Sequence, residues 1–86
     1  MDIPYLEENQ FAVGKAELST GIILRNDGTR FQNGEDLNRM YQIFNSCEGA
    51  KKFILEKIKD DYEIEYWIVD SKGNYLIPYD KHGMRG

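Results

Sequence analysis

Hydrophobic and polar residues alternate along the first third of the chain in a way that predicts short strands. The apolar positions from Phe11 to Leu18 alternate loosely, which predicts one strand. A second strand is expected over Ile22–Arg25, followed directly by Asn26-Asp27-Gly28-Thr29. Because an Asp-Gly pair tolerates the positive φ angles of a type I′ turn, this sequence predicts a hairpin in which Leu24 lies opposite Phe31 and both face the core.

Residues 32–45 fit two different periodicities. Asn33-Gly34 indicates a second turn, with room for a single helical turn after it. In Arg39–Asn45, Tyr41 and Ile43 alternate as in a strand, while the spacing of neighbouring apolar residues also fits a helix. We favour a strand ending near Asn45, because Ser46 is a preferred N-cap that would begin a separate helix. Whether residues 35–45 form strand or helix stays open.

The most regular pattern lies between Cys47 and Asp60 and predicts an amphipathic helix. One stripe is apolar and the opposite side carries lysines and Glu56. Gly49 stands where a capping box would have its acid. The stripe consists of Cys47, Ala50, Phe53, Ile54 and Ile58, with Leu55 at its edge. Such a helix packs across a sheet.

A second hairpin is predicted after the helix. Glu63–Val69 alternates, Asp70-Ser71-Lys72-Gly73 forms a turn, and Asn74–Tyr79 returns. A three-residue turn sets Trp67 opposite Ile77, Val69 opposite Tyr75 and Glu65 opposite Tyr79. One helix covers only one face, so we expect aromatic surface on the other; which face is buried stays open.

These elements predict an α+β fold: a mostly antiparallel sheet of about five to six strands with one main helix, about 47–60, packed on one face. The 86 residues form a single domain, 1–86. Residues 1–9 are expected to be an irregular entry segment packing through Tyr5 and Leu6, and residues 80–86 a frayed tail. The strand order, including a parallel crossover through the helix, stays open.

Composition narrows the function. With 15 acidic and 11 basic residues the net charge is −4, which disfavours nucleic acid as a partner. The single cysteine, Cys47, cannot form an internal disulfide, so a reducing cytoplasm is expected. The N-terminal residues resemble neither a signal peptide nor a membrane span, and no membrane association is expected.

Catalytic chemistry is not expected. The only histidine, His82, lies in the predicted tail, away from any candidate nucleophile. Cys47 at the first helical position would feel the helix dipole, but a small buried hydrophobe is the simpler interpretation. We find no ligand spacing for zinc or calcium and no phosphate-binding glycine run, so no metal or cofactor is predicted.

Two features favour binding to a protein. The run Asp60-Asp61-Tyr62-Glu63-Ile64-Glu65 places four acids at a helix C-terminus, where negative charge is locally unfavourable. A solvated connection would explain it equally simply. The second feature is the Trp67 face of the hairpin, which either packs under the N-terminal segment or first hairpin, or is exposed as an anchor for a basic partner. The candidate partner-binding residues are Asp60, Asp61, Glu63, Glu65, Trp67, Tyr75 and Tyr79.

The blocks Tyr41–Ile54 and Ile64–Gly73, with their order of strand, cap, helix, strand and turn, resemble small immunity proteins of bacterial polymorphic and contact-dependent toxin systems. The resemblance implies a cytosolic inhibitor that binds one cognate toxin, often a cationic nuclease, and blocks its active site or a necessary surface. The sequence thus predicts a non-catalytic, acidic protein-binding module. The alternative is a homo-oligomeric structural or adaptor domain, such as a homodimer, formed through a strand edge or the aromatic face.

Overall fold

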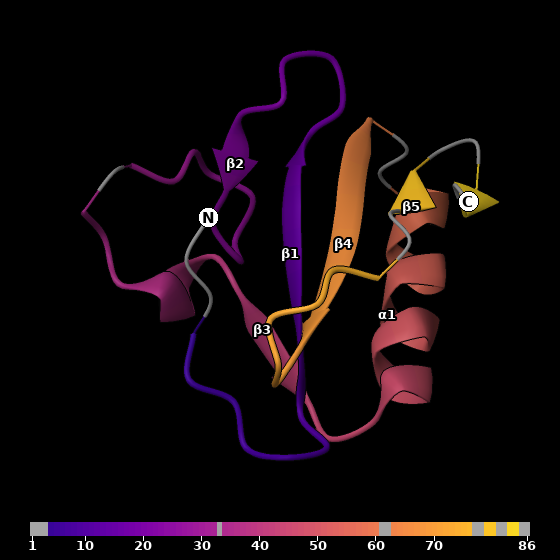
Figure 1. Ribbon diagram of the computed structural model, residues 1–86. Coiled ribbons are helices and arrows are strands. Elements are labelled where there is room, and N and C mark those ends of the chain that lie inside the picture. The colour runs from indigo at the N-terminus through magenta and orange to yellow at the C-terminus, as the bar shows by residue number, and fades with distance from the viewer. Residues whose placement is uncertain (1–3, 33, 61–62, 77–78, 81–82, 85–86) are drawn as a thin grey trace.

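The computed structural model describes residues 4–32, 34–60, 63–76, 79–80 and 83–84, with the backbone alone for 60, 79–80 and 83–84. The predicted α+β class is confirmed (Figure 1). The elements in chain order are β1 (Phe11–Glu17), β2 (Ile23–Leu24), the 3-10 turn η1 (Leu37–Arg39), β3 (Gln42–Phe44), α1 (Cys47–Asp60), β4 (Ile64–Asp70), β5 (Tyr79–Asp80) and β6 (Gly83–Met84). Residues 35–45 therefore hold both a helical turn and a strand.

The sheet is antiparallel and is built around β1. This strand pairs with β4 along its whole length, from Phe11 opposite Asp70 to Glu17 opposite Ile64. β2 and β3 share its other edge. Because β3 and β4 are both antiparallel to β1, they run parallel to each other, and α1 carries the chain from one to the other across β1. A crossover of this kind was one of the two alternatives that the sequence left open.

The expected total of about five to six strands is not confirmed, because beyond β1 to β4 the sheet continues only through the short segments β5 and β6. β5 and β6 are two-residue segments beyond β4. Tyr79 pairs with Tyr66. Within the tail 80–86, which was predicted to fray, Asp80 pairs with Gly83, and Met84 pairs back with Tyr79.

Alternation along the strands divides the apolar side chains into two layers. The layer under α1 joins the stripe of the helix to the face of β4 that carries Ile64, Tyr66 and Ile68. Its buried members are Val13, Leu24, Ala50, Ile54, Ile64, Tyr66 and Ile68. The helix α1 therefore covers the face of the sheet opposite to the one that carries Trp67.

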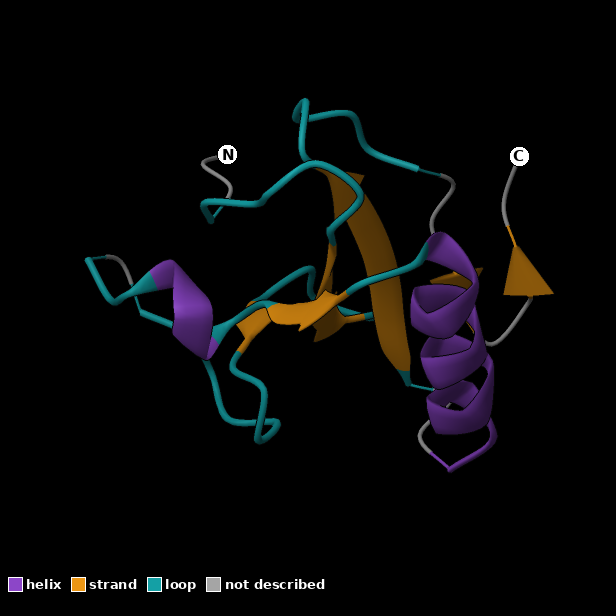
Figure 2. Ribbon diagram, turned by 90° about the horizontal axis from the view of Figure 1, so that it is seen from below, coloured by secondary structure: helices purple, strands orange, loops and turns teal. Residues whose placement is uncertain are grey.

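The second layer lies on the other face of the sheet and is also covered. Leu6 of the entry segment and residues 40–41 after η1 pack over the small residues of β1 and over Trp67. Its buried members are Leu6, Ala12, Ala16, Met40, Tyr41, Trp67 and Val69. Figure 2 shows α1 on one side of the sheet and the N-terminal segment on the other. The expectation of a broadly exposed aromatic face is wrong, because two irregular segments serve as the second cover.

The entry segment uses only part of its predicted contacts. Leu6 is buried, as expected, and Pro4 is buried beside it. Tyr5 is 83% exposed, so its predicted packing role is wrong. Successive residues of an extended segment point to opposite sides, and here Leu6 takes the inward side.

The first hairpin differs from the prediction by one residue. Leu24 pairs with Arg30, not with Phe31. Arg25 N donates to Thr29 O at 2.6 Å, so the loop contains three residues, with Gly28 at φ 93°. The shift places Leu24 and Phe31 in different layers, since one step of register exchanges the faces of a strand.

The second hairpin agrees with the prediction at its turn and departs from it further along. Val69 pairs with Tyr75, as expected. Tyr79 pairs with Tyr66 and not with Glu65. The predicted partner of Trp67, Ile77, lies outside the described residues. The turn thus sets the initial register but not the alignment of β5.

An ion-pair network ties the first hairpin to the segment before η1. Arg25 donates to both carboxylate oxygens of Glu35, each at 2.9 Å, and Gln32 N donates to the same carboxylate at 2.6 Å. The Arg25 hydrogen bonds, followed by that of Gln32, hold the pKa of Glu35 below its ordinary value. This bidentate pair anchors the part of the chain that leads to the second layer.

Ser46 is the N-cap of α1, as predicted, because its Oγ accepts a hydrogen bond from Gly49 N at 3.0 Å. We expect Ser46→Ala to lower the free energy of unfolding by about 1 kcal/mol, since one helix N–H loses its acceptor. Urea denaturation measures the loss. The control is Ser19→Ala, an exposed turn position expected to change stability by less than about 0.5 kcal/mol. Equal effects of the two substitutions would contradict the capping role.

Candidate protein-binding face

Three of the predicted binding residues share one face of the sheet. Glu65 and Trp67 alternate with Tyr66 along β4 and therefore point away from α1. Tyr75 pairs with Val69, which lies on the same face. Glu65 and Val69 are four residues apart, so Glu65 and Tyr75 flank Trp67 at a separation of about 13 Å along the strand. We call Glu65, Trp67 and Tyr75 the Trp67 face.

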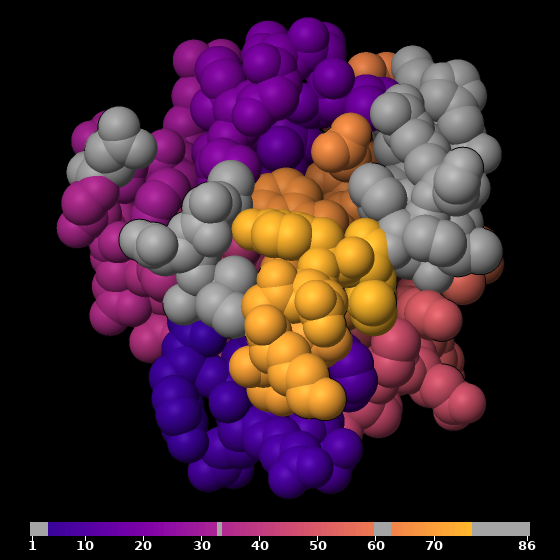
Figure 3. Space-filling model, in the orientation of Figure 1, coloured from indigo at the N-terminus to yellow at the C-terminus, as the bar shows by residue number. Residues whose placement is uncertain are grey.

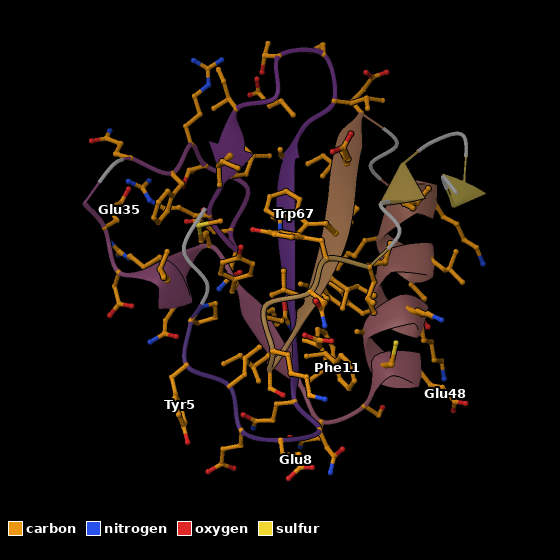
Figure 4. The ribbon with its side chains drawn as sticks, viewed as in Figure 1. Tyr5, Glu8, Phe11, Glu35, Glu48 and Trp67 are labelled. Atoms are coloured by element: carbon orange, nitrogen blue, oxygen red, sulfur yellow. The ribbon has the colours of Figure 1, made fainter. Side chains whose placement is uncertain are left out.

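Trp67 is the buried centre of this face and not an exposed anchor. Only 7% of the residue is exposed, and its ring lies against Gly14 of β1, its cross-strand partner. A Cβ at position 14 would overlap Cζ2 and Cε2 of the indole. Of the two alternatives left open for Trp67, the structure shows packing under the N-terminal segment and not exposure as an anchor, since Leu6 belongs to the same buried cluster. The indole lies across β1, where Gly14 leaves room for the ring (Figure 4).

Tyr41 holds the indole from the other side. The two rings meet edge to face, with centroids 6.3 Å apart and planes at 90°, and Trp67 Nε1 donates to Tyr41 Oη at 3.4 Å. Burial raises the pKa of the Tyr41 hydroxyl; the bond from Trp67 acts against this, and the interaction with Tyr75 adds to it. Trp67 and Tyr41 thus form a hydrogen-bonded ring pair in the buried layer of this face.

Tyr75 lies on the same face, opposite Val69, and is 51% exposed. In Figure 3, atoms of β4 are visible between the loop after β1 and residues 71–76, so the face is hollowed at this point. The result is an exposed tyrosine, Tyr75, on a face whose buried layer contains the packed pair of Trp67 and Tyr41. Such a surface suits binding, because an exposed tyrosine held in place loses little entropy when it meets a partner.

The acidic residues lie toward one end of the Trp67 face. Glu63 is exposed and Glu65 is half-buried, beside Ala16 in the register of β1 and β4. Asp60 is the last residue of α1, and its side chain lies outside the described part of the structure. Asp61 and the side chain of Tyr79 also lie outside it. The structure thus places Glu63 and Glu65 near one another in the sequence of β4 and the residue before it, and it does not describe the side chains of Asp60, Asp61 and Tyr79.

Two contributors to the site were missed from the sequence. The alternating pattern identifies Gly14 only as a strand residue, although a glycine within a strand often marks a place where another group packs closely against the backbone. Tyr41 was assigned to a strand or a helix without a role. Its contact with Trp67 joins residues 26 positions apart, which periodicity cannot reveal.

The residues that the structure describes contain no group of three or more His, Cys, Asp or Glu side chains that could hold a metal ion. Cys47 is a free, half-buried thiol at the start of α1. None of the described helices has the length and apolar character needed to cross a membrane.

Comparisons with protein-family models, curated proteins and solved structures give no match for this chain.

We expect Gly14→Ala to destabilise the protein by about 1–3 kcal/mol, because the added methyl overlaps the indole of Trp67 and forces it to move. The free energy of unfolding, followed by circular dichroism in urea, measures this cost. In a Trp67→Phe background the same substitution should cost clearly less, since the smaller ring lacks the atoms in question. Strict additivity of the two changes would contradict the contact.

Tyr41→Phe should cost about 1–3 kcal/mol at neutral pH, because the buried indole N–H loses its acceptor. The pKa of Tyr41 in the folded state is raised above its ordinary value of 10.0, which applies to the unfolded chain. The stability that the protonated hydroxyl contributes is therefore complete below pH 10.0 and is lost as pH rises through the folded-state pKa. The wild-type advantage should therefore shrink above pH 10.0. Urea titrations at several alkaline pH values measure it. Tyr5→Phe, at a ring 83% exposed, is the matched control and should change stability by less than about 0.5 kcal/mol.

Proposed function

We propose that this protein is a non-catalytic, acidic protein-binding module, a cytoplasmic immunity protein that neutralises a cognate basic toxin, such as a nuclease. The observation that supports it best is the half-exposed Tyr75 on the same face as Glu65, next to the packed pair of Trp67 and Tyr41. A fixed aromatic edge next to carboxylates has the composition of an interface hot spot.

Charge supports a basic partner. The chain carries a net charge of −4, and Glu63 and Glu65 lie at one end of the Trp67 face. Asp60 and Asp61 precede them in the sequence and would extend the same acidic end. Negative charge on such a face accelerates encounter with a cationic surface, and the acceleration falls as salt screens it.

The mode of inhibition follows from the shape of the face. Tyr75 would contact apolar surface on the toxin, while the carboxylates pair with lysines or arginines that a nuclease uses to hold phosphates. Trp67 contributes by packing against Tyr41 in the buried layer of this face, rather than by direct contact with the toxin. Such an inhibitor blocks a site by occupying it and needs no chemical step.

The first test is co-purification with the product of a toxin gene adjacent to the gene for this chain, followed by association kinetics over a salt series. We expect Glu63→Gln with Glu65→Gln to slow association about 3- to 10-fold at low salt and to flatten the salt dependence. Glu48→Gln with Glu56→Gln is the matched control. It removes the same charge from exposed positions on α1, which covers the other face of the sheet.

Tyr75→Ala should mainly speed dissociation, by about 10-fold or more if Tyr75 is a hot spot.

Equal effects of the Glu63/Glu65 and Glu48/Glu56 double substitutions would mean that only net charge affects association and that the Trp67 face is not the interface. Sedimentation distinguishes this function from the alternative, a homo-oligomeric domain. If the protein forms a stable dimer at micromolar concentration and Tyr75→Ala dissociates it, the Trp67 face serves self-association instead of a foreign partner.

A further inference from the structure

A cleft of about 530 Å³ lies on the α1 side of the sheet, away from the Trp67 face. Tyr66 of β4 and Lys15 of β1, which are opposite each other in the register, contribute to its lining. Phe53 and Lys57 line it from α1, and Asn26 lines it from the loop of the first hairpin. Residues distant in sequence thus converge on one concave site, as they do in ligand pockets.

The wall at the hairpin loop is fixed by hydrogen bonds. Lys15 Nζ donates to Asn26 O at 3.0 Å, which holds the ammonium at the cleft. Asn26 is itself clamped: its N–H donates to Arg39 O at 2.7 Å and its Nδ2 to Asn38 O at 3.0 Å. The position of the Lys15 charge is therefore set before any ligand arrives, which reduces the entropy lost on binding.

The wall at α1 is aromatic and carries the second cation. Lys57 Nζ lies 5.7 Å from the centroid of the Phe53 ring, within the range of a cation–π contact. Phe53 in turn meets Tyr66 edge to face, with centroids 6.5 Å apart. A ligand in the cleft would meet an aromatic surface and an ammonium group from the same helix.

The cleft is positive although the protein is acidic. Among the described residues that line it are Lys15, Lys57 and one acid, Asp27. Asp27 Oδ1 accepts hydrogen bonds from Thr29 Oγ1 at 2.6 Å and Thr29 N at 2.9 Å; these bonds, and the nearby charges of Arg25 and Lys15, hold the pKa of Asp27 below its ordinary value. Asp27 therefore offsets part of the charge of Lys15, and positive charge remains in excess among the described lining residues.

We propose that this cleft binds a small aromatic anion, an aryl phosphate or aryl carboxylate, with its charged group between Lys15 and Lys57 and its ring against Phe53. The volume of about 530 Å³ falls within the range of small-molecule sites, roughly 300–1,000 Å³. Gln42 adds an amide to the lining for orientation of the polar group. The proposal is independent of the protein-binding function, because the cleft and the Trp67 face lie on opposite sides of the sheet.

Phenyl phosphate is the test ligand, with inorganic phosphate and phenol as its two halves. Titrations followed by 15N–1H correlation spectra should show saturable shifts for phenyl phosphate at Gly28, Lys57 and the Gln42 side chain. Each half alone should bind about 10-fold more weakly or worse, since either the ion pairs or the ring contact is missing. Benzoate in place of phenyl phosphate then decides between phosphate and carboxylate as the preferred group.

Lys57→Gln should weaken phenyl phosphate about 10-fold, and Lys15→Met by a similar factor, without loss of the folded spectrum. Lys59→Gln is the matched control, because Lys59 is on the same helix and does not line the cleft. Three results would overturn the proposal: shifts that do not saturate or lie elsewhere, equal weakening by Lys59→Gln, or phenol binding as tightly as phenyl phosphate.

Discussion

The structure depends on a central strand with small residues on one face. In β1, Ala12, Gly14 and Ala16 point away from α1, and their small size leaves room for a second apolar layer. Trp67 fills that room by lying on Gly14, and Tyr41 then packs against Trp67. A sheet covered by one helix becomes a three-layer domain in this way, which raises the buried fraction of a short chain.

Local signals in the sequence were sufficient for the parts of the fold that depend on local physics. α1 was predictable because a cap at Ser46 and an apolar stripe coincide, and both are properties of adjacent residues. Val69 was correctly placed opposite Tyr75, because the turn between them is short. The crossover between β3 and β4 could be suggested but not decided, since pairing with β1 is a long-range choice.

The errors share one cause: they concern which face of a strand is covered and by what. The one-residue shift at Leu24 came from reading Asp27-Gly28 as a two-residue turn, when Asn26 is also part of the loop and is held there by bonds to Asn38 and Arg39. The cover over Trp67 comes from Leu6 and from residues 40–41, segments without a strong pattern. The register of the second hairpin therefore predicted that Glu65, Trp67 and Tyr75 share a face, but the sequence could not decide whether Trp67 is covered.

The position of β1 also has a consequence for how the chain is made. This strand is synthesised early, yet Phe11 pairs with Asp70, and its other edge needs β3. During synthesis β1 can pair with β2 and β3 on one edge, while its other edge stays open until β4 has emerged. Open strand edges invite pairing with other chains, so the helix that joins β3 to β4 closes the period of greatest risk.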